Sequence, residues 1–339
     1  MLLKEKYDLD TILLASGCVP EHSRADRTRL VTDLLVSNSR PLHNMVPLIV
    51  ASSPDSIRIT PELRAKYLSL IAVHVRQMAW LRHFIETLLP EDISIMVLKG
   101  HALIGSVYSN DHPRLSCDID LLVRKKDFNR VCQLIEADSV VSRKTSMHLG
   151  FFIDLPYKVQ VEIHSDIADR HAFNINFDAV WRNSKPHPMF HNERIRVMSV
   201  EDQFLHMLLH GFNHAQYEAY MIVDAIRICN QPEFDVNVLI AHAREMGCSR
   251  LLRGFVDGFD FVRYHQDFAR VVREIPAQRW LMKAQVWYFQ GNRIQHFSVR
   301  RQLLGFMFLD SCVNMSLSLI ESIRVISRRI ARWAFNLLH

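Results

Sequence analysis

The sequence predicts an α+β fold, in which a small core with a mixed sheet is flanked by N-terminal helices and a larger C-terminal helical region. Apolar residues recur at three- and four-residue spacing up to about residue 90. Short apolar runs then alternate with helical segments, as in a small α/β unit. Helical periodicity returns near residue 196. We therefore expect three regions, at residues 1–91, 92–195 and 196–339.

The N-terminal region is expected to contain helices at residues 26–36 and 61–89. Thr60 is a suitable N-cap for the second helix, Pro61 fits its first turn, and Pro90 ends it. The apolar positions of this helix predict a stripe that packs on the core, made of Tyr67, Ile71, Val75, Met78 and Leu81.

The central region is expected to begin with a strand, a helix and a second strand. Their predicted bounds are 93–98, 101–108 and 117–123. A helix at 126–137 and two strands at 151–155 and 158–164 follow. Residues 171–195, with two prolines, are expected to form a connector with little regular structure, in which Trp181 is an anchor.

Helical periodicity resumes after Ser199, which has the position of an N-cap, with Asp202 in the first turn. His206, His210 and His214 follow at four-residue spacing and so share one helix face. A histidine pair at this spacing can bind zinc, but the zinc-protease motif also needs a Glu between the two histidines, and none is present here. The alternative is that this face lines a cleft.

Composition and charge are those of an ordinary globular protein with a mild basic bias. Hydrophobic residues make up 49% and the formal net charge is +5, which is compatible with a protein that handles phosphates or nucleic acid. The six cysteines are scattered, and the N-terminus has acids and lysines where a signal peptide needs an apolar core. These features predict a reduced, cytoplasmic protein.

The segment Asp118-Ile119-Asp120 carries the strongest chemical signal. On a strand, residues two apart point to the same face, so Asp118 and Asp120 are expected to project together. Two adjacent carboxylates repel each other, so their proximity is unfavourable unless a cation binds between them. Hard oxygen ligands at this spacing suit Mg²⁺ or Mn²⁺, and such ions can assist phosphoryl transfer.

A third carboxylate lies on the strand predicted at 158–164. Its alternation places Gln160, Glu162 and His164 on one face. If this strand lies beside the one that carries the two aspartates, Glu162 can bind the same metal. His164 can orient a metal-bound water, contact substrate or be structural.

The order of these features resembles the polymerase-beta-like nucleotidyltransferase superfamily, and more narrowly the bacterial family labelled "uncharacterised nucleotidyltransferase". The matching features are Leu98-Lys99-Gly100, Arg114, the run from Asp118 to Val123, the strand from Val161 to His164, and the helical residues His210, His214 and Asp224. The resemblance spans roughly residues 95 to 250. A departure occurs at His101, where the superfamily generally has Gly or Ser.

The resemblance implies transfer of an NMP from an NTP, such as ATP, to an acceptor hydroxyl, with release of pyrophosphate. It assigns the catalytic and metal-binding roles to Asp118, Asp120 and Glu162, with Mg²⁺ or Mn²⁺ as cofactor, and phosphate binding to Lys99 and Gly100. It also favours a cleft lined by His210 and His214.

Two further residues that the resemblance includes have open roles. Arg114 can meet the triphosphate, because a guanidinium matches phosphate oxygens, or can form a surface ion pair with a nearby acid. Asp224 is expected to pair with a basic neighbour such as Arg227.

The acceptor and the partners are left open by the sequence. Candidates are tRNA or other RNA, a sugar, a lipid-linked intermediate and a protein. A predicted basic amphipathic helix at 316–337 can contact nucleic acid or a membrane surface, or dock on the protein with its basic face in solvent. Two alternative functions are a catalytically silent nucleotide-binding or partner-binding scaffold, suggested by His101, and a phosphohydrolase that uses water as acceptor.

Overall fold

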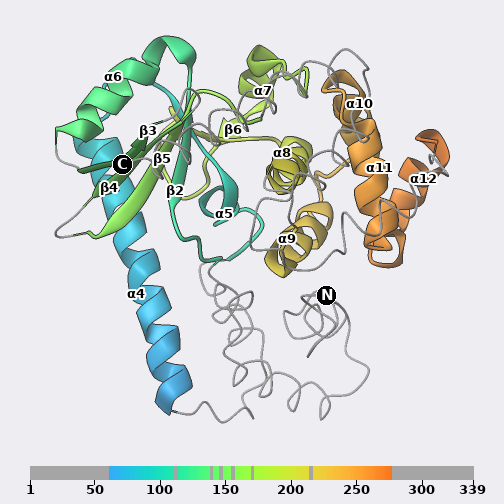
Figure 1. The fold of residues 1–339 in the computed structure, drawn as a ribbon, viewed down its shortest axis with the longest axis horizontal. Coiled ribbons are helices and arrows are strands. Elements are labelled where there is room, and N and C mark those ends of the chain that lie inside the picture. The colour runs from blue at the N-terminus through green and yellow to red at the C-terminus, as the bar shows by residue number, and fades with distance from the viewer. Residues whose placement is uncertain are drawn as a thin grey trace, which may run out of the picture.

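A computed structural model describes residues 61–109, 114–137, 140–144, 148–153, 157–168, 172–213 and 217–276 of the chain. The helices predicted at 26–36 and 316–337, and also Thr60 and His214, lie outside the described residues. Within the described part, the fold is α+β, as predicted: a mixed sheet with helices on both faces (Figure 1).

The sheet has seven strands in the order β3-β4-β5-β2-β1-β7-β6. Their bounds are β1 Ile95–Val97, β2 Ile119–Val123, β3 Val140–Lys144, β4 His148–Ile153, β5 Val159–His164, β6 Lys185–Pro186 and β7 Ile195–Val197. β2 and β5 are parallel, as are β1 and β7, and the other pairs are antiparallel.

The helices precede, interrupt and follow the sheet in the chain. α4 (Pro61–His83) continues into a π-helix (Phe84–Leu88), and the helices between strands are α5 Lys99–Ala102, α6 Lys125–Glu136 and α7 Phe177–Asn183. The C-terminal helices are α8 Val200–Asn213, α9 Ala219–Cys229, α10 Val236–Glu245, α11 Ser249–Gly258 and α12 Ala269–Glu274, with short 3-10 turns at Phe261–Arg263 and Gln266–Phe268.

Side-chain alternation along the strands divides the protein into two hydrophobic cores. In β2, Ile119 and Leu121 belong to the core between the sheet and the helices α4 and α6. Leu122 points to the opposite face and joins the core of the C-terminal helices. Polar residues on this second face therefore lie on the side of the sheet that packs against the C-terminal helices.

The side chains of Ser199 and Asn176 cap helices, the first of them as predicted. Ser199 caps α8, since its Oγ accepts a hydrogen bond from the Asp202 amide at 3.2 Å. Asn176 caps α7 in the same way, with a 3.1 Å bond from the Ala179 amide. These side chains satisfy amides that have no partner within the helix.

The helix predicted at 101–108 is wrong in its bounds. α5 begins two residues earlier and ends at Ala102, and turns follow. Gly105 has φ +82°, outside the right-handed helical region, so the helix cannot continue. The early start places Lys99 in the first turn of α5.

The connector predicted at 171–195 also contains regular structure that the sequence reading missed. α7 and β6 lie within it, and β7 begins at its end, with Trp181 buried in α7. β3 was missed too. β6 has two residues and β7 has three, and an alternation this short cannot be distinguished from a loop in sequence. Pairing with β1 makes β7 a strand.

The apolar stripe predicted on α4 is wrong in part. Val75 is 58% exposed, whereas Leu70, Gln77 and Trp80 are buried together with Leu81. The N-terminal half of α4 extends away from the sheet, so burial there is decided by where the sheet ends (Figure 1).

Candidate active site

The turn from β1 into α5 places Lys99 beside β2. The Leu98 amide donates a hydrogen bond to the Asp120 carbonyl oxygen at 2.9 Å, which extends the antiparallel pairing of β1 and β2. Lys99 then adopts φ +53°, an uncommon conformation for a residue with a side chain. Its Nζ lies 2.6 Å from Asp120 Oδ1. The backbone geometry therefore brings an ammonium group onto a buried carboxylate.

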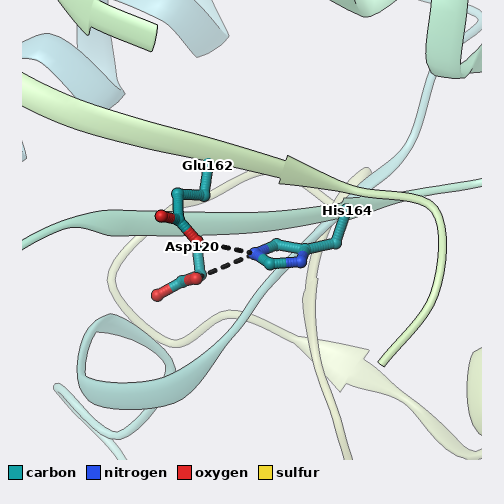
Figure 2. A group of neighbouring side chains, drawn as sticks. All are labelled: Asp120, Glu162 and His164. Atoms are coloured by element: carbon teal, nitrogen blue, oxygen red, sulfur yellow. Dashed lines mark hydrogen bonds and ion pairs between the residues drawn. The ribbon is translucent and has the colours of Figure 1, made fainter. Parts of the chain in front are cut away.

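Parallel pairing of β2 with β5 brings the acids of two distant segments together. Asp120 lies directly opposite Glu162 in the register. His164, two residues on, faces the same side as Glu162, and its Nε2 lies 2.9 Å from Asp120 Oδ1 and 3.6 Å from Glu162 Oε2 (Figure 2). One ligand atom from each of these three side chains lies within 4.8 Å of the others. This arrangement can hold a metal ion.

The carboxylate of Asp120 is used unequally. Oδ1 accepts from both Lys99 and His164, whereas Oδ2 is buried and has no hydrogen-bond partner. Burial alone would raise the pKa of Asp120, but the Lys99 charge and the His164 hydrogen bond lower it far below its usual range. Burial likewise opposes the charge on Lys99, and the nearby carboxylates of Asp120 and Asp118 raise its pKa above the ordinary value. Asp120 is therefore ionised, with one oxygen available to a cation.

Asp118 lies just before β2 and outside the three-residue cluster. Ser116 Oγ donates to Asp118 Oδ1 at 3.3 Å. Burial, followed by the negative charge of Asp120, raises the pKa of Asp118 to about 6. An acid that ionises reluctantly beside another acid is stabilised in its charged form by a bound cation.

A cavity of about 270 Å³ lies between the sheet, α5 and the C-terminal helices. Its polar lining residues are Lys99, Arg114, Ser116, Cys117, Asp118, Glu162, Gln203, His206, His210, Tyr220 and Asp224. α8 contributes His206 and His210, which lie on the same face of this helix. Burial and the charge of Lys99 lower the pKa of His206 to about 3, so its imidazole is neutral near pH 7.

Arg114 borders this cavity in a buried ion pair. Its Nε lies 2.9 Å from Asp224 Oδ1 and its Nη2 lies 2.9 Å from Oδ2. Tyr108 also donates to Asp224 Oδ1, at 2.6 Å. The expected pairing of Asp224 with Arg227 is therefore replaced by one with Arg114, since α9 presents Asp224 toward the segment before β2. Arg227 instead lies over the Tyr108 ring, 4.9 Å from its centroid.

Gly100 packs closely against Ser116. A Cβ at this position would lie 3.2 Å from Ser116 Cβ. His101 is buried, and its ring stacks on His74 with centroids 6.1 Å apart, outside the cavity lining. Burial, then the nearby His74, lowers its pKa to about 3. The bulky residue at the family's small-residue position therefore does not fill the cavity.

The structure thus brings most of the sequence-predicted site residues to one place. Lys99, Gly100, Arg114, Asp118, Glu162 and His210 border the cavity, and Asp120 lies behind it, in contact with Lys99. Nothing is described for His214. His206 also borders the cavity, as expected from the helix face that it shares with His210. Tyr220 and Tyr108 had no signal, because their position depends on how α9 and the loop after α5 pack.

The chain was compared with protein families, curated proteins and solved structures. A family model described as "Uncharacterised nucleotidyltransferase" matches residues 43–257. The chain belongs to this family. The match covers the sheet, the candidate metal-binding cluster and the helices that line the cavity. No curated protein and no solved structure matches the chain.

Membership supports a nucleotidyltransferase-like function for this family member and indicates a transferase. The cluster of Asp120, Glu162 and His164 is a candidate site for the divalent metal that such enzymes use. His206 and His210 do not belong to a cluster of this kind in the described part of the chain. Among the described residues, no helix is long and apolar enough to cross a membrane.

Proposed function

We propose that this protein is a metal-dependent nucleotidyltransferase, which transfers an NMP from an NTP to an acceptor hydroxyl and releases pyrophosphate. The observation that carries the proposal is the position of the acids. Asp120 on β2 and Glu162 on β5 are neighbours in the paired strands. Asp118 borders the same cavity as Glu162. Three carboxylates beside a cavity suit a phosphoryl-transfer site, because they can hold the cation that neutralises phosphate charge.

Asp118, Asp120 and Glu162 would hold Mg²⁺ or Mn²⁺. The unpartnered Oδ2 of Asp120 and the raised pKa of Asp118 both fit carboxylates that are stabilised by a cation. Such an ion supplies charge stabilisation for the phosphates. Glu162 would accept the proton of the acceptor hydroxyl while the oxygen of that hydroxyl attacks the α-phosphorus. The bond between the α-phosphorus and its bridging oxygen then breaks, and pyrophosphate leaves.

Lys99 and the Gly100 backbone would bind the nucleotide phosphates. Both border the cavity, and Gly100 packs closely against Ser116. His210 faces the same cavity and would contact the nucleotide, and His214 is assigned the same role by resemblance alone. The guanidinium of Arg114 is engaged by Asp224, so a contact with the triphosphate stays a prediction.

The acceptor belongs to one of the classes that the sequence leaves open: RNA, a sugar, a lipid-linked intermediate or a protein. The net charge of +5 is compatible with an anionic acceptor such as tRNA. A cytoplasmic location is part of the proposal. It agrees with the cysteines of the sequence, which are scattered and form no C-x-x-C pair.

The test is transfer of label from an NTP. The purified protein is incubated with each NTP labelled at the α-phosphate, with Mg²⁺ or Mn²⁺, and with separate cellular RNA, protein and small-molecule fractions. Label should move to one fraction with wild-type protein. Asp120→Asn should reduce this transfer at least ~1,000-fold, because the metal loses its buried ionised ligand.

Asp92→Asn is the matched control, because Asp92 is an exposed acid paired with Arg130 on the surface. It should transfer label at the wild-type rate. Full activity in Asp120→Asn would refute the assignment. Binding of metal and nucleotide without transfer to any fraction would identify a scaffold, and release of phosphate instead of pyrophosphate would identify a phosphohydrolase.

A further inference from the structure

We propose that His164 is itself a ligand of the metal ion and that its imidazole makes the site prefer Mn²⁺ over Mg²⁺. The inference rests on the proposed function, because it adds a nitrogen ligand to the same metal site. The sequence reading left His164 with three alternatives, namely orientation of a water, substrate contact or a structural role.

The positions of the donor atoms fit a shared ion. Two ligands at right angles around an ion about 2.1 Å from each lie ~3 Å apart. His164 Nε2 lies 2.9 Å from Asp120 Oδ1 and 3.6 Å from Glu162 Oε2, close to that spacing. Figure 2 shows the imidazole nitrogen directed at both carboxylates, so the three side chains converge on one place.

The strands hold this arrangement in place. Glu162 and His164 lie on the same face of β5, whose opposite face is buried in the core. Asp120 is fixed opposite Glu162 by the pairing of β2 with β5. Sites built on strands hold their ligands more precisely than sites on loops.

A second observation points independently to a cation. Asp120 is fully buried, and its Oδ2 has no hydrogen-bond partner. A buried carboxylate oxygen without a partner is costly, and an ion that contacts both oxygens of Asp120 would satisfy it. The Lys99 ammonium contacts Oδ1 and leaves Oδ2 unsatisfied.

The donor set decides which ion is preferred. Carboxylate oxygens suit Mg²⁺ and Mn²⁺ alike, whereas an imidazole nitrogen suits first-row transition metals. Mn²⁺ accepts both kinds of ligand and, like Mg²⁺, takes an octahedral set of oxygens. A site that adds an imidazole to its carboxylates should therefore bind Mn²⁺ more tightly than Mg²⁺.

The test measures metal binding by the full chain without nucleotide. Mn²⁺ binding is followed by electron paramagnetic resonance, and Mg²⁺ binding by its competition with Mn²⁺. Wild type should bind Mn²⁺ at least ~10-fold more tightly, and His164→Gln should reduce that preference to within about 3-fold. Pulsed spectra of bound Mn²⁺ should show modulation from a coordinated nitrogen in wild type and none in His164→Gln.

His191→Gln is the matched control, because it removes an exposed imidazole remote in sequence from the cluster. It should keep both the preference and the nitrogen modulation. Circular dichroism and thermal melting establish that His164→Gln is folded, and His164→Asn serves as a second variant.

The outcomes separate the two proposals. Wild type without nitrogen modulation, or an unchanged preference in folded His164→Gln, overturns the role of His164. If His164 proves not to be a ligand but Asp120→Asn loses metal binding, the metal-dependent function stands. Failure of wild type to bind either ion overturns both proposals.

Discussion

At the residue scale, Asp120 is the centre of the site, and its two oxygens have different surroundings. Oδ1 contacts Lys99 and His164, and Oδ2 has no partner. The Lys99 ammonium thus neutralises the carboxylate in the absence of a metal ion. In the proposed enzyme, a metal ion bound at Asp120 would take over this role and release Lys99 to the nucleotide phosphates.

This exchange predicts how Lys99→Met behaves in thermal melting. Without metal, the variant removes the ammonium partner of a buried carboxylate and leaves His164 as its remaining contact. It should lose roughly 2 kcal/mol of stability, less than for a fully buried pair, because the Lys99 side chain is 21% exposed and His164 is retained. Added Mn²⁺ should restore Asp120's partner, so the melting temperature should rise more in the variant than in wild type.

Lys99→Arg is the conservative comparison, because it keeps the charge beside Asp120. Its metal-free stability should lie closer to that of wild type. An equal rise in melting temperature on addition of Mn²⁺ to wild type and Lys99→Met would contradict the exchange.

At the element scale, helix pairs are joined by polar contacts that the sequence pattern does not indicate. α8 and α10 are linked by His242 Nδ1, which lies 2.8 Å from Asp202 Oδ1. The hydrogen bond to Asp202 raises the pKa of His242 above its ordinary value of 6.5, against the opposing effect of burial. The protonated imidazole is therefore favoured by the folded state.

The raised pKa sets the direction of a pH dependence. The stabilisation by His242 should be fully present below pH 6.5 and be lost as the pH rises through the folded-state pKa. The difference in free energy of unfolding between wild type and His242→Gln should therefore shrink from pH 6 to alkaline pH, measured in urea. Asp202→Asn should give the same trend, and a difference that does not vary with pH would contradict it.

At the scale of the whole molecule, the cavity is closed by contacts between residues far apart in the chain. The Arg114–Asp224 ion pair joins the segment before β2 to α9 across 110 positions, and Arg114 also lies 4.4 Å from the centroid of the Tyr220 ring. This pair fixes the C-terminal helices against the side of the sheet that carries the acids. It therefore holds the wall of the active-site cavity.

Removal of one member of this buried pair should be strongly destabilising. Asp224→Ala leaves the Arg114 charge unpaired and should cost about 3–5 kcal/mol in urea unfolding. Tyr108→Phe, which removes a single hydrogen bond to the same carboxylate, should cost about 1 kcal/mol. The double variant Arg114→Met/Asp224→Leu should be less destabilised than Asp224→Ala, and strictly additive costs would contradict the pairing.

The pattern of residues along the chain was enough to predict the α+β class, the strands β2 and β5, and the candidates Asp118, Asp120 and Glu162. These depend on local periodicity and on residue type, which are visible along the chain. It also indicated the cap of α8, because capping involves residues three apart. The three regions at 1–91, 92–195 and 196–339 stay a prediction.

Only the tertiary structure decided which side chains meet. The parallel pairing of β2 with β5 sets Asp120 opposite Glu162. These two residues are 42 positions apart in the chain, and the packing of the two strands brings them together. The same packing turned Asp224 toward Arg114 and brought His164 onto Asp120. Periodicity fixes which face of a strand a residue occupies, but pairing and register depend on burial shared among elements, which no single segment encodes.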